Sequence, residues 1–190
     1  MTDDRLRDSQ VVHRVLAGET DGFRELVERY QARVYGIALR VVGNRAEAED
    51  LTQHSFLEAF RGLASFDSAR SFSTWLFSIA MNNCRDYLKS HKRREHQLVG
   101  EVEPGSAMFS GRIQDPDEVL NDRERVDLLG AALARLDPKY RIPLVLKDVE
   151  GLSYNEIEQV LGLPVTTLKI RVVRARDQLQ EQLKPWIARN

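Results

Sequence analysis

Residues 151–176, GLSYNEIEQVLGLPVTTLKIRVVRAR, predict two helices separated by a short turn. Ser153 and Glu156 have the spacing of a capping box, in which each side chain accepts a hydrogen bond from a backbone N–H left free at the helix start. Gly162 supplies the turn. Pro164 suits the first turn of the second helix, where its missing N–H costs nothing.

The second helix has two unlike faces. Apolar residues at spacings of three and four predict a buried stripe of Val165, Leu168, Val172, Ala175 and Leu179. The far face and its flanks carry Thr166, Thr167, Lys169, Ile170, Arg171, Val173, Arg174, Arg176 and Asp177. A helix in the DNA major groove can use Ile170 and Val173 against thymine methyls, while threonine and arginine bond base edges. The pattern favours a helix-turn-helix and leaves an ordinary helical hairpin with basic flanks as the alternative.

Composition limits the class of protein. The chain has 190 residues, 42% hydrophobic and 30% charged, as in a folded water-soluble protein. The net charge of −1 means that any nucleic-acid surface is a local patch, and it disfavours tight DNA binding by the chain alone. The single cysteine excludes an internal disulfide and fits a reducing compartment. The polar start does not resemble a signal peptide, and no apolar run approaches the ~20 residues of a membrane span, so we expect a cytoplasmic protein without membrane insertion.

Helical periodicity runs through most of the chain, and strand patterns are weak. Helices are expected at residues 9–17, 23–42, 44–63 and 72–93, with later helix starts at Asp115-Pro116 and Asp137-Pro138. Gly, Pro and Ser with few periodic apolar residues indicate a linker after residue 96. The predicted fold is all-α: two small helical domains at 1–96 and 116–190, joined by a flexible linker at 97–115, with the helix-turn-helix in the second.

The helix predicted at 44–63 has a mixed outer face. Its inner side is apolar or small: Ala48, Leu51, Thr52, Ser55, Phe56, Ala59 and Leu63. Its outer side carries Asp50, Gln53, His54, Leu57 and Arg61. Leu57 among polar residues suggests a protein-binding face. Single exposed leucines are common, so an ordinary solvent-exposed leucine is the alternative.

The helix predicted at 72–93 combines aromatic and cationic residues. It is expected to pack through Phe72, Leu76, Ile79, Ala80, Asn83 and Tyr87. The opposite stripe is polar and becomes cationic toward its end: Thr74, Ser78, Met81, Arg85, Lys89 and Lys92. Trp75 lies at the edge of this stripe, and Phe66 and Phe72 flank the preceding loop. Aromatic side chains beside cations suit single-stranded DNA, while an amphipathic helix with a solvated basic end is the alternative.

Signatures of an enzyme are missing from the sequence. It contains no Gly-rich phosphate loop, no HExxH and no Gly-x-Ser-x-Gly elbow. His91 and His96 flank a basic segment and are interpreted as surface residues. Cys84 and His91 can share a helix face, but two ligands do not make a zinc site, and Cys84 is interpreted as a packing residue. We expect no catalytic residue, no metal and no cofactor.

Three stretches carry a resemblance: AEAEDLTQHSFLEAF, FSTWLFSIAMNNCRDYL and DVEGLSYNEIEQVLGLPVTTLKIRVVRARDQL. In order and spacing they resemble the extracytoplasmic-function sigma factors of bacterial RNA polymerase, over nearly the whole chain. The resemblance implies that the first domain binds the polymerase clamp and opens the −10 promoter element, and that the last domain reads the −35 element. It implies core RNA polymerase, promoter DNA and an anti-sigma factor as partners.

The resemblance also implies roles for residues at matching positions. Those implied to bind polymerase are Asp50, Leu51, Gln53, Phe56 and Leu57. Those implied to act at the −10 element are Phe66, Arg70, Phe72, Thr74, Trp75, Asn82, Arg85 and Lys89. Those implied to act at the −35 element are Thr166, Thr167, Lys169, Ile170, Arg171, Val173 and Arg174, with Arg141 as a phosphate contact.

Three positions depart from the family pattern. His54 stands where a Glu is usual, Thr166 where a Gly is usual, and Ile170 where a small polar residue is usual. The last two lie on the groove-facing side, so the −35 preference cannot be copied from a relative. We interpret the chain as a promoter-specificity subunit and not a catalyst. The alternative is a stand-alone helix-turn-helix regulator, which predicts specific duplex binding without polymerase and leaves the first-domain motifs unexplained.

The linker gives a first testable prediction. Its composition, from Gln97 to Gln114, cannot bury a core, so limited proteolysis of the free protein should cut there first and leave two helical fragments. Gel electrophoresis with mass spectrometry of the fragments checks the position of the cut. Earlier cutting inside either predicted domain contradicts the two-domain interpretation.

Overall fold

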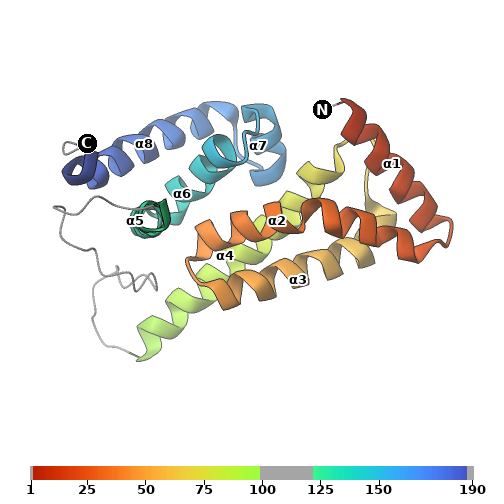
Figure 1. The fold of residues 1–190 in the computed structure, drawn as a ribbon, viewed down its shortest axis with the longest axis horizontal. Helices are drawn as coiled ribbons and strands as arrows, with labels where there is room; N and C mark the ends of the chain where they lie inside the picture. Colours follow the sequence, from red (N-terminus) through yellow and green to blue (C-terminus); the bar gives the residue numbers. More distant parts are fainter. Residues whose placement is uncertain (1, 99–121, 188–190) are drawn as a thin grey trace.

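The computed structural model describes residues 2–98 and 122–187, and these residues are helical almost throughout (Figure 1). The N-terminal half contains α1 (Thr2–Leu16), the 3₁₀ turn η1 (Thr20–Gly22), α2 (Phe23–Val42), α3 (Arg45–Gly62), the 3₁₀ turn η2 (Leu63–Ser65) and α4 (Phe72–Leu98). The C-terminal half contains α5 (Asp122–Arg135), α6 (Pro138–Leu144), the π-helical turn η3 (Val145–Val149), α7 (Tyr154–Leu161) and α8 (Val165–Ile187). The predicted all-α fold is confirmed.

Most of the predicted linker lies outside the described residues. Its first two residues, 97 and 98, still belong to α4. The predicted helix start at Asp115 and Pro116 also lies outside them. The domain boundaries therefore stay a prediction.

Local sequence signals place several helix ends. Gly43 and Gly162 end α2 and α7 with left-handed φ angles of 76° and 66°, which a residue with a Cβ rarely adopts. The capping box of Ser153 and Glu156 is formed in both directions. Pro164 lies one residue ahead of α8 and not in its first turn, and its carbonyl accepts the first hydrogen bond of that helix.

Two helices are longer than expected. Helix α1 begins at Thr2 and not at residue 9, and α4 continues to Leu98 and not to residue 93. The additional turns are polar and carry no apolar repeat. Periodicity marks only the part of a helix that packs against a core, so it missed these turns.

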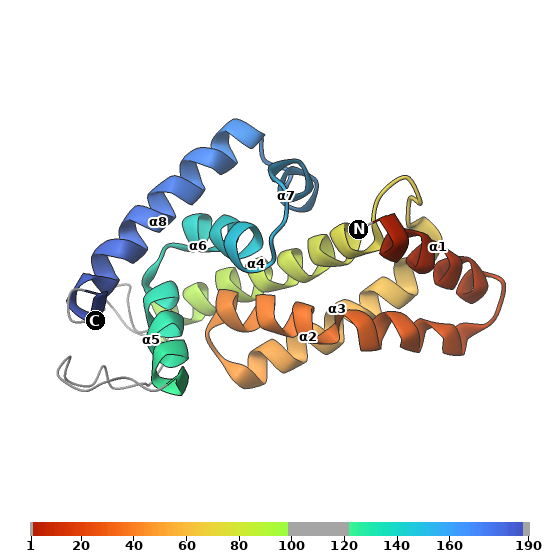
Figure 2. The same cartoon turned by 45° about the horizontal axis from the view of Figure 1, so that its top comes forward.

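Helix α4 is buried over a wider arc than the sequence predicted. It packs against α2, α3 and α7, as the view in Figure 2 shows. Thr74 and Met81, expected on a polar outer stripe, are 2% and 0% exposed, and Cys84 is also fully buried. The expected stripe was wrong at these positions because α4 is covered from more than one side. Cys84 is a packing residue, as predicted.

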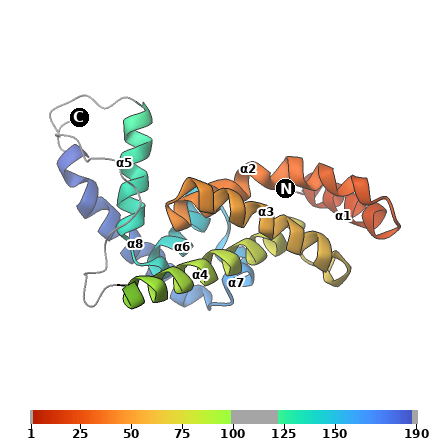
Figure 3. The same cartoon turned by 90° about the horizontal axis from the view of Figure 1, so that it is seen from below.

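The two halves of the chain share one hydrophobic core. A single cluster of buried side chains joins Phe77, Met81 and Cys84 of α4 to residues of the C-terminal half: Ile142, Leu146, Leu152, Ile157, Val160, Leu161 and Leu168. Helix α5, helix α6 and η3 also contact α2. Figure 3, viewed from below, shows α7 lying along α4. The helix-turn-helix is therefore packed directly on the N-terminal half.

The capping box gives a prediction about stability. Ser153→Ala removes the Oγ atom that accepts the backbone N–H of Glu156 at 3.2 Å, so it should lower the free energy of unfolding by about 1 kcal/mol. Urea unfolding followed by circular dichroism measures this difference. Ser90→Ala, on the exposed end of α4, is the matched control and should change stability by no more than about 0.5 kcal/mol. Equal effects would contradict a capping role.

Candidate nucleic-acid and polymerase surfaces

Helix α8 has the two faces that its sequence predicted. Leu168, Val172 and Ala175 are 0% exposed and fix the helix against its neighbours. Opposite them Ile170 and Val173 are 55% and 52% exposed, although both are apolar. The remaining predicted −35 residues on this helix are exposed or half-buried: Thr166, Thr167, Lys169, Arg171 and Arg174. An apolar and cationic outer face of this kind suits a base-reading helix, because the stripe that holds the fold is on the other side.

Internal contacts fix the flanks of this helix. Lys169 Nζ lies 5.8 Å from the ring centroid of Tyr154, and Lys147 Nζ lies 5.1 Å from the same ring. Arg176 donates two hydrogen bonds to the carboxylate of Asp148, at 2.8 and 2.6 Å. The bond to Asp148 raises the pKa of Arg176. Arg176 therefore ties α8 to η3, while Lys169 is held beside the aromatic ring.

Arg141, the implied phosphate contact, is not at the surface. The residue is 5% exposed, and its Nη1 donates to the carbonyl of Ala134 at 3.1 Å. Its Nε finds no hydrogen-bond partner among the described residues. Burial lowers the pKa of Arg141 to about 10, with Asp137 acting in the opposite direction. The guanidinium lies close enough to Cys84 of α4 for its charge to act on the thiol, so in this conformation it cannot reach a phosphate.

Three aromatic rings form the base of the loop that precedes α4. The ring centroids of Phe66, Phe72 and Trp75 lie 5.2 to 5.8 Å apart. Phe72 is 1% exposed, whereas Phe66 and Trp75 are half-buried at the rim. The contacts hold the two rim rings in place, and partly exposed rings of this kind can stack on unpaired bases.

Short-range hydrogen bonds shape the same loop. Asp67 Oδ1 accepts the N–H of Ala69 at 2.9 Å, which is an Asx turn. Ser71 Oγ accepts the N–H of Thr74 at 3.2 Å and lies 2.6 Å from the Thr74 hydroxyl, so it caps α4. Thr74 is therefore buried in the cap and supports the loop from beneath, while the predicted contact Arg70 is exposed.

The remaining −10 candidates lie along α4. Asn82 and Lys89 are exposed, and Lys89 pairs with Asp86 at 3.1 Å. Arg85 is half-buried, and its pKa is lowered by burial and then by the charge of Arg171 on α8. The structure thus brings a −10 candidate and a −35 candidate together. Neither helix pattern signals this approach, because it depends on how the halves pack.

The predicted polymerase-binding residues on α3 fall into two groups. Asp50, Gln53 and Leu57 are exposed, with Leu57 at 53%. Leu51 is half-buried, and Phe56 is 7% exposed within the core, where it supports the face from the inside.

Sequence reasoning missed Phe60 on this face. It is 41% exposed, and its ring centroid lies 5.1 Å from that of Phe23 in an edge-on contact. Leu57 and Phe60 are three residues apart on one helix and are therefore neighbours on its surface. The sequence could have indicated this face, because Leu57 and Phe60, two large apolar residues three positions apart, lie outside the predicted inner side of the helix.

A polar network joins this face to α4. His54 Nε2 and Glu58 Oε1 lie 3.3 Å apart, one helical turn from each other. Asn83 of α4 donates to Glu58 Oε2 at 2.9 Å and to Ser55 Oγ at 3.1 Å. The residue that departs from the family pattern, His54, is thus linked to the helix that carries the −10 candidates.

Other kinds of site are not supported by the described residues. Among them, no three histidine, cysteine or acidic side chains form a group that could hold a metal ion. Burial raises the pKa of the Cys84 thiol to about 12, so the thiol is not a reactive thiolate. In the same part of the chain, no helix has the length and apolar character that crossing a membrane requires.

Comparison with known proteins identifies both halves. Residues 26–94 match the family Sigma-70 region 2, and residues 127–179 match the family Sigma-70, region 4. The chain is 35% identical to the ECF RNA polymerase sigma factor SigW of Bacillus subtilis over 178 residues, which are 91% of this chain and 95% of that protein.

Two solved structures are similar over most of the chain. The sigma factor RpoE in complex with the anti-sigma factor NepR from Bartonella quintana has a TM-score of 0.66 at 27% identity, covering 85% of this chain and 96% of that one. CnrH in complex with the cytosolic domain of CnrY also has a TM-score of 0.66, at 28% identity, covering 95% and 97%. The two sequence matches fall, in order, on the helices that carry the surfaces described above. The chain therefore belongs to the ECF sigma factors of the sigma-70 family, non-catalytic proteins that give RNA polymerase its promoter specificity.

Proposed function

We propose that this sigma factor binds core RNA polymerase through the outer face of α3, the −10 element through the loop before α4, and the −35 element through α8. The observation that carries the proposal is the outer face of α8, where Ile170 and Val173 are more than half exposed opposite a fully buried stripe. The exposed apolar groups are not needed for packing, and the major groove offers them a partner in which apolar and cationic groups are both used.

The two DNA surfaces read different forms of DNA. Phe66 and Trp75, held at the loop rim by Phe72, offer ring faces to unstacked bases, while Arg70 offers a cation to the backbone. Helix α8 offers Thr166 and Arg174 as hydrogen-bonding groups for base pairs in duplex form. One surface thus suits strand-separated DNA, and the other suits an intact helix.

The polymerase-binding face combines a charged edge and an apolar centre. Asp50 and Gln53 are exposed next to the neighbouring apolar pair Leu57 and Phe60. Apolar residues surrounded by polar ones are the usual composition of a specific protein interface. Acting on RNA polymerase places the protein in the cytoplasm.

An anti-sigma factor is the further partner that we propose. Of the two similar solved structures, each covering most of this chain, RpoE is in complex with the anti-sigma factor NepR, and CnrH is in complex with the cytosolic domain of CnrY. An inhibitor that covers any of the three surfaces would prevent their use. Co-purification of the tagged chain from its own cell extract, followed by mass spectrometry, identifies the partner, and absence of any inhibitor of transcription among the bound proteins contradicts it.

Transcription with purified components tests the function directly. Purified core RNA polymerase, a pool of genomic DNA fragments and this protein should give transcripts whose 5′ ends share two sequence elements upstream. Sequencing of the start sites reads both elements at once. Starts that do not depend on the protein, or that share no upstream element, would contradict the proposed role.

Arg174→Ala tests the −35 surface. Arg174 is exposed opposite the buried stripe, so its removal leaves no cavity, and the loss of a base-edge contact should cost roughly 1–3 kcal/mol in promoter binding. Initial transcription rates at limiting holoenzyme measure the effect, and core affinity should be unchanged. Gln180→Ala, an exposed residue farther along α8, is the control and should leave promoter use at the wild-type level. Parallel loss of core affinity and promoter use in Arg174→Ala would rule out this assignment.

A double substitution tests the polymerase face. Asp50→Ala with Gln53→Ala should unfold near the wild-type midpoint, because surface changes usually alter stability by no more than about 0.5 kcal/mol. The same double mutant should bind core polymerase more weakly, because truncating one partner of a charge contact that becomes buried in the interface costs about 2–5 kcal/mol. Core affinity is measured by fluorescence anisotropy of the labelled protein.

His54→Glu is the internal comparison for this face. It restores the residue usual in the family and should keep or improve binding, although it also places a second carboxylate beside Glu58. Wild-type core affinity in the double mutant would show that α3 does not make the contact.

A further inference from the structure

A ridge of three side chains on α3 runs along the edge of the proposed polymerase face. Asp50, His54 and Glu58 follow one another at intervals of four residues, so they are neighbours along one line of the helix surface. The side chains of His54 and Glu58 are 56% and 43% exposed. Glu58 is also next in sequence to Leu57, the exposed apolar residue of the same face. The ridge therefore adds a second carboxylate to this face, two helical turns from Asp50.

The carboxylate of Glu58 is held from two sides. Nε2 of His54 lies 3.3 Å from its Oε1, and Nδ2 of Asn83 on α4 donates to its Oε2 at 2.9 Å. The same nitrogen of Asn83 donates to Ser55 Oγ at 3.1 Å, and Ser55 is 0% exposed. Asn83 is therefore anchored in the contact between α3 and α4 while it reaches outward to Glu58.

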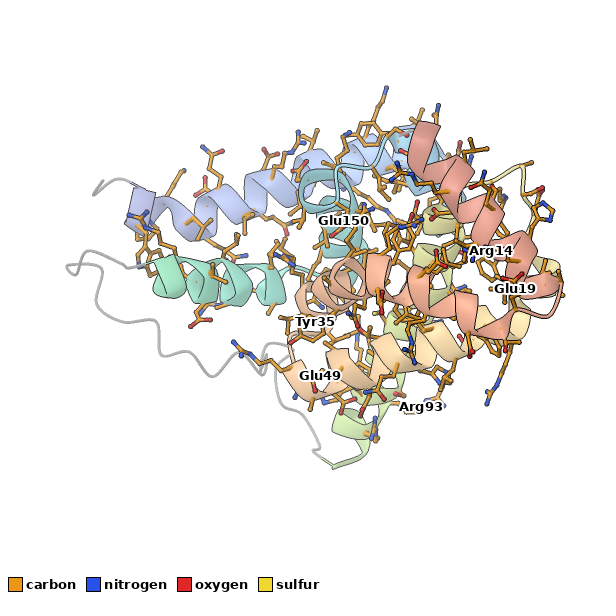
Figure 4. All side chains as sticks on the ribbon, turned by 45° about the vertical axis from the view of Figure 1, so that its right-hand side comes forward. Arg14, Glu19, Tyr35, Glu49, Arg93 and Glu150 are labelled. Atoms are coloured by element: carbon orange, nitrogen blue, oxygen red, sulfur yellow. The ribbon has the colours of Figure 1, made fainter. Side chains whose placement is uncertain are left out.

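The antiparallel course of α3 and α4 makes this contact possible. Figure 4 shows Glu49, near the start of α3, on the same side of the molecule as Arg93, near the end of α4. The two helices pack against each other. Asn83, near the middle of α4, consequently lies level with Ser55 and Glu58 in the later part of α3.

Holding an exposed carboxylate in this way is more than stability requires. Water alone satisfies such a group, and exposed ion pairs add little to stability. Fixing the side chain does remove rotamer freedom before a partner arrives, so less freedom is lost on binding. A carboxylate has about four acceptor positions, of which two are occupied here. Glu58 can therefore keep both internal contacts and still accept hydrogen bonds from another protein.

The partner group that fits Glu58 is a basic side chain. A hydrogen bond from Arg or Lys to a carboxylate is about twice as strong as one between neutral groups. Asp50 and Glu58 are eight residues apart, or about 12 Å along the helix, so they form a negative edge beside the apolar pair Leu57 and Phe60. A protein surface with basic groups around an apolar centre is complementary to this edge.

We propose that Glu58 is a polymerase-binding residue that takes a basic side chain of the core enzyme, and that Asn83 and His54 are positioning residues that hold its carboxylate for this contact. The inference rests on the proposed function of the outer face of α3. It adds a contact residue to that face and gives α4 a part in shaping it.

Glu58→Gln removes the charge and keeps the shape of the side chain. It should lower the affinity for core polymerase about tenfold, equivalent to about 1.4 kcal/mol. The affinity should also depend less on salt than that of wild type, because one attraction between opposite charges is lost. Fluorescence anisotropy of the labelled full-length chain with purified core polymerase, repeated at several salt concentrations, measures both quantities. Wild-type affinity in this variant would overturn the proposal.

Glu181→Gln is the matched control. Glu181 lies on α8, its side chain is 68% exposed, and it pairs with Lys184 three residues away. The change in net charge is the same as in Glu58→Gln, but the residue lies outside the proposed polymerase face. Its core affinity and salt dependence should match wild type. A loss equal to that of Glu58→Gln would show a general effect of net charge and overturn the proposed contact.

A double-mutant cycle tests the positioning role of Asn83. Asn83→Ala leaves the charge of Glu58 in place but removes its donor, so it should lower core affinity about threefold in the wild-type background. In the Glu58→Gln background the same change should cost nothing further, because the contact that Asn83 serves is already absent. Equal losses in both backgrounds would mean that Asn83 acts through the fold and would overturn its positioning role.

Asn83→Asp tests the same role without opening a cavity. It places a carboxylate beside Glu58 in place of a donor, so core affinity should fall further than in Asn83→Ala. Combined with Glu58→Gln it should have little effect, because the two carboxylates no longer face each other. Circular dichroism and urea midpoints separate these effects from unfolding. Unchanged core affinity in Asn83→Asp would overturn the positioning of Glu58 by α4.

The double mutant Asp50→Ala with Gln53→Ala separates this inference from the proposed function. If it binds core polymerase weakly while Glu58→Gln binds normally, α3 still carries the polymerase face and only the role of Glu58 is wrong. If both bind normally, the outer face of α3 is not the polymerase contact, and the proposed function fails together with the inference.

Discussion

The burial of α4 on several sides is the constraint on which the rest of the structure depends. An ordinary surface helix buries one stripe and leaves the other side to water. Helix α4 instead buries Leu76, Ala80 and Cys84, which the sequence predicted, and also Phe77 and Met81. Because α2, α3 and α7 all pack on it, this helix sets the position of the loop at its start and of the helix-turn-helix beside it.

Positive and negative charges nearly cancel in this protein. The net charge is −1, so long-range attraction to DNA is weak and recognition depends on a few local cations. Some charged groups are engaged within the fold, as Arg176 is with Asp148 and Arg33 with Glu150. Under the proposed function, the polymerase brings this nearly neutral protein to DNA.

What the sequence predicted well is local in origin. The capping box at Ser153, the left-handed glycine at 162 and the buried stripe through Leu168 each depend on residues within two or three turns. Burial that depends on distant parts of the chain was missed. The sequence around Thr74 and Met81 does not indicate that α4 is covered on a second side. The sequence around Arg141 and Arg85 does not indicate contact with the other half of the chain. The ordered sequence motifs predicted which residues make up the candidate surfaces. Which of these residues are exposed became clear only from the packing in the structure.

The residues that position α8 in the fold are different from the residues that α8 is proposed to use for recognition. Gly162 and the two residues after it fix how α8 leaves α7, while Leu168, Val172 and Ala175 hold α8 in place. Ile170 and Val173 take no part in that packing. Substitution at such exposed positions usually changes stability by no more than about 0.5 kcal/mol. Under the proposed function, descendants of this gene can therefore exchange outward residues of α8 and acquire new target sequences without first evolving a more stable scaffold.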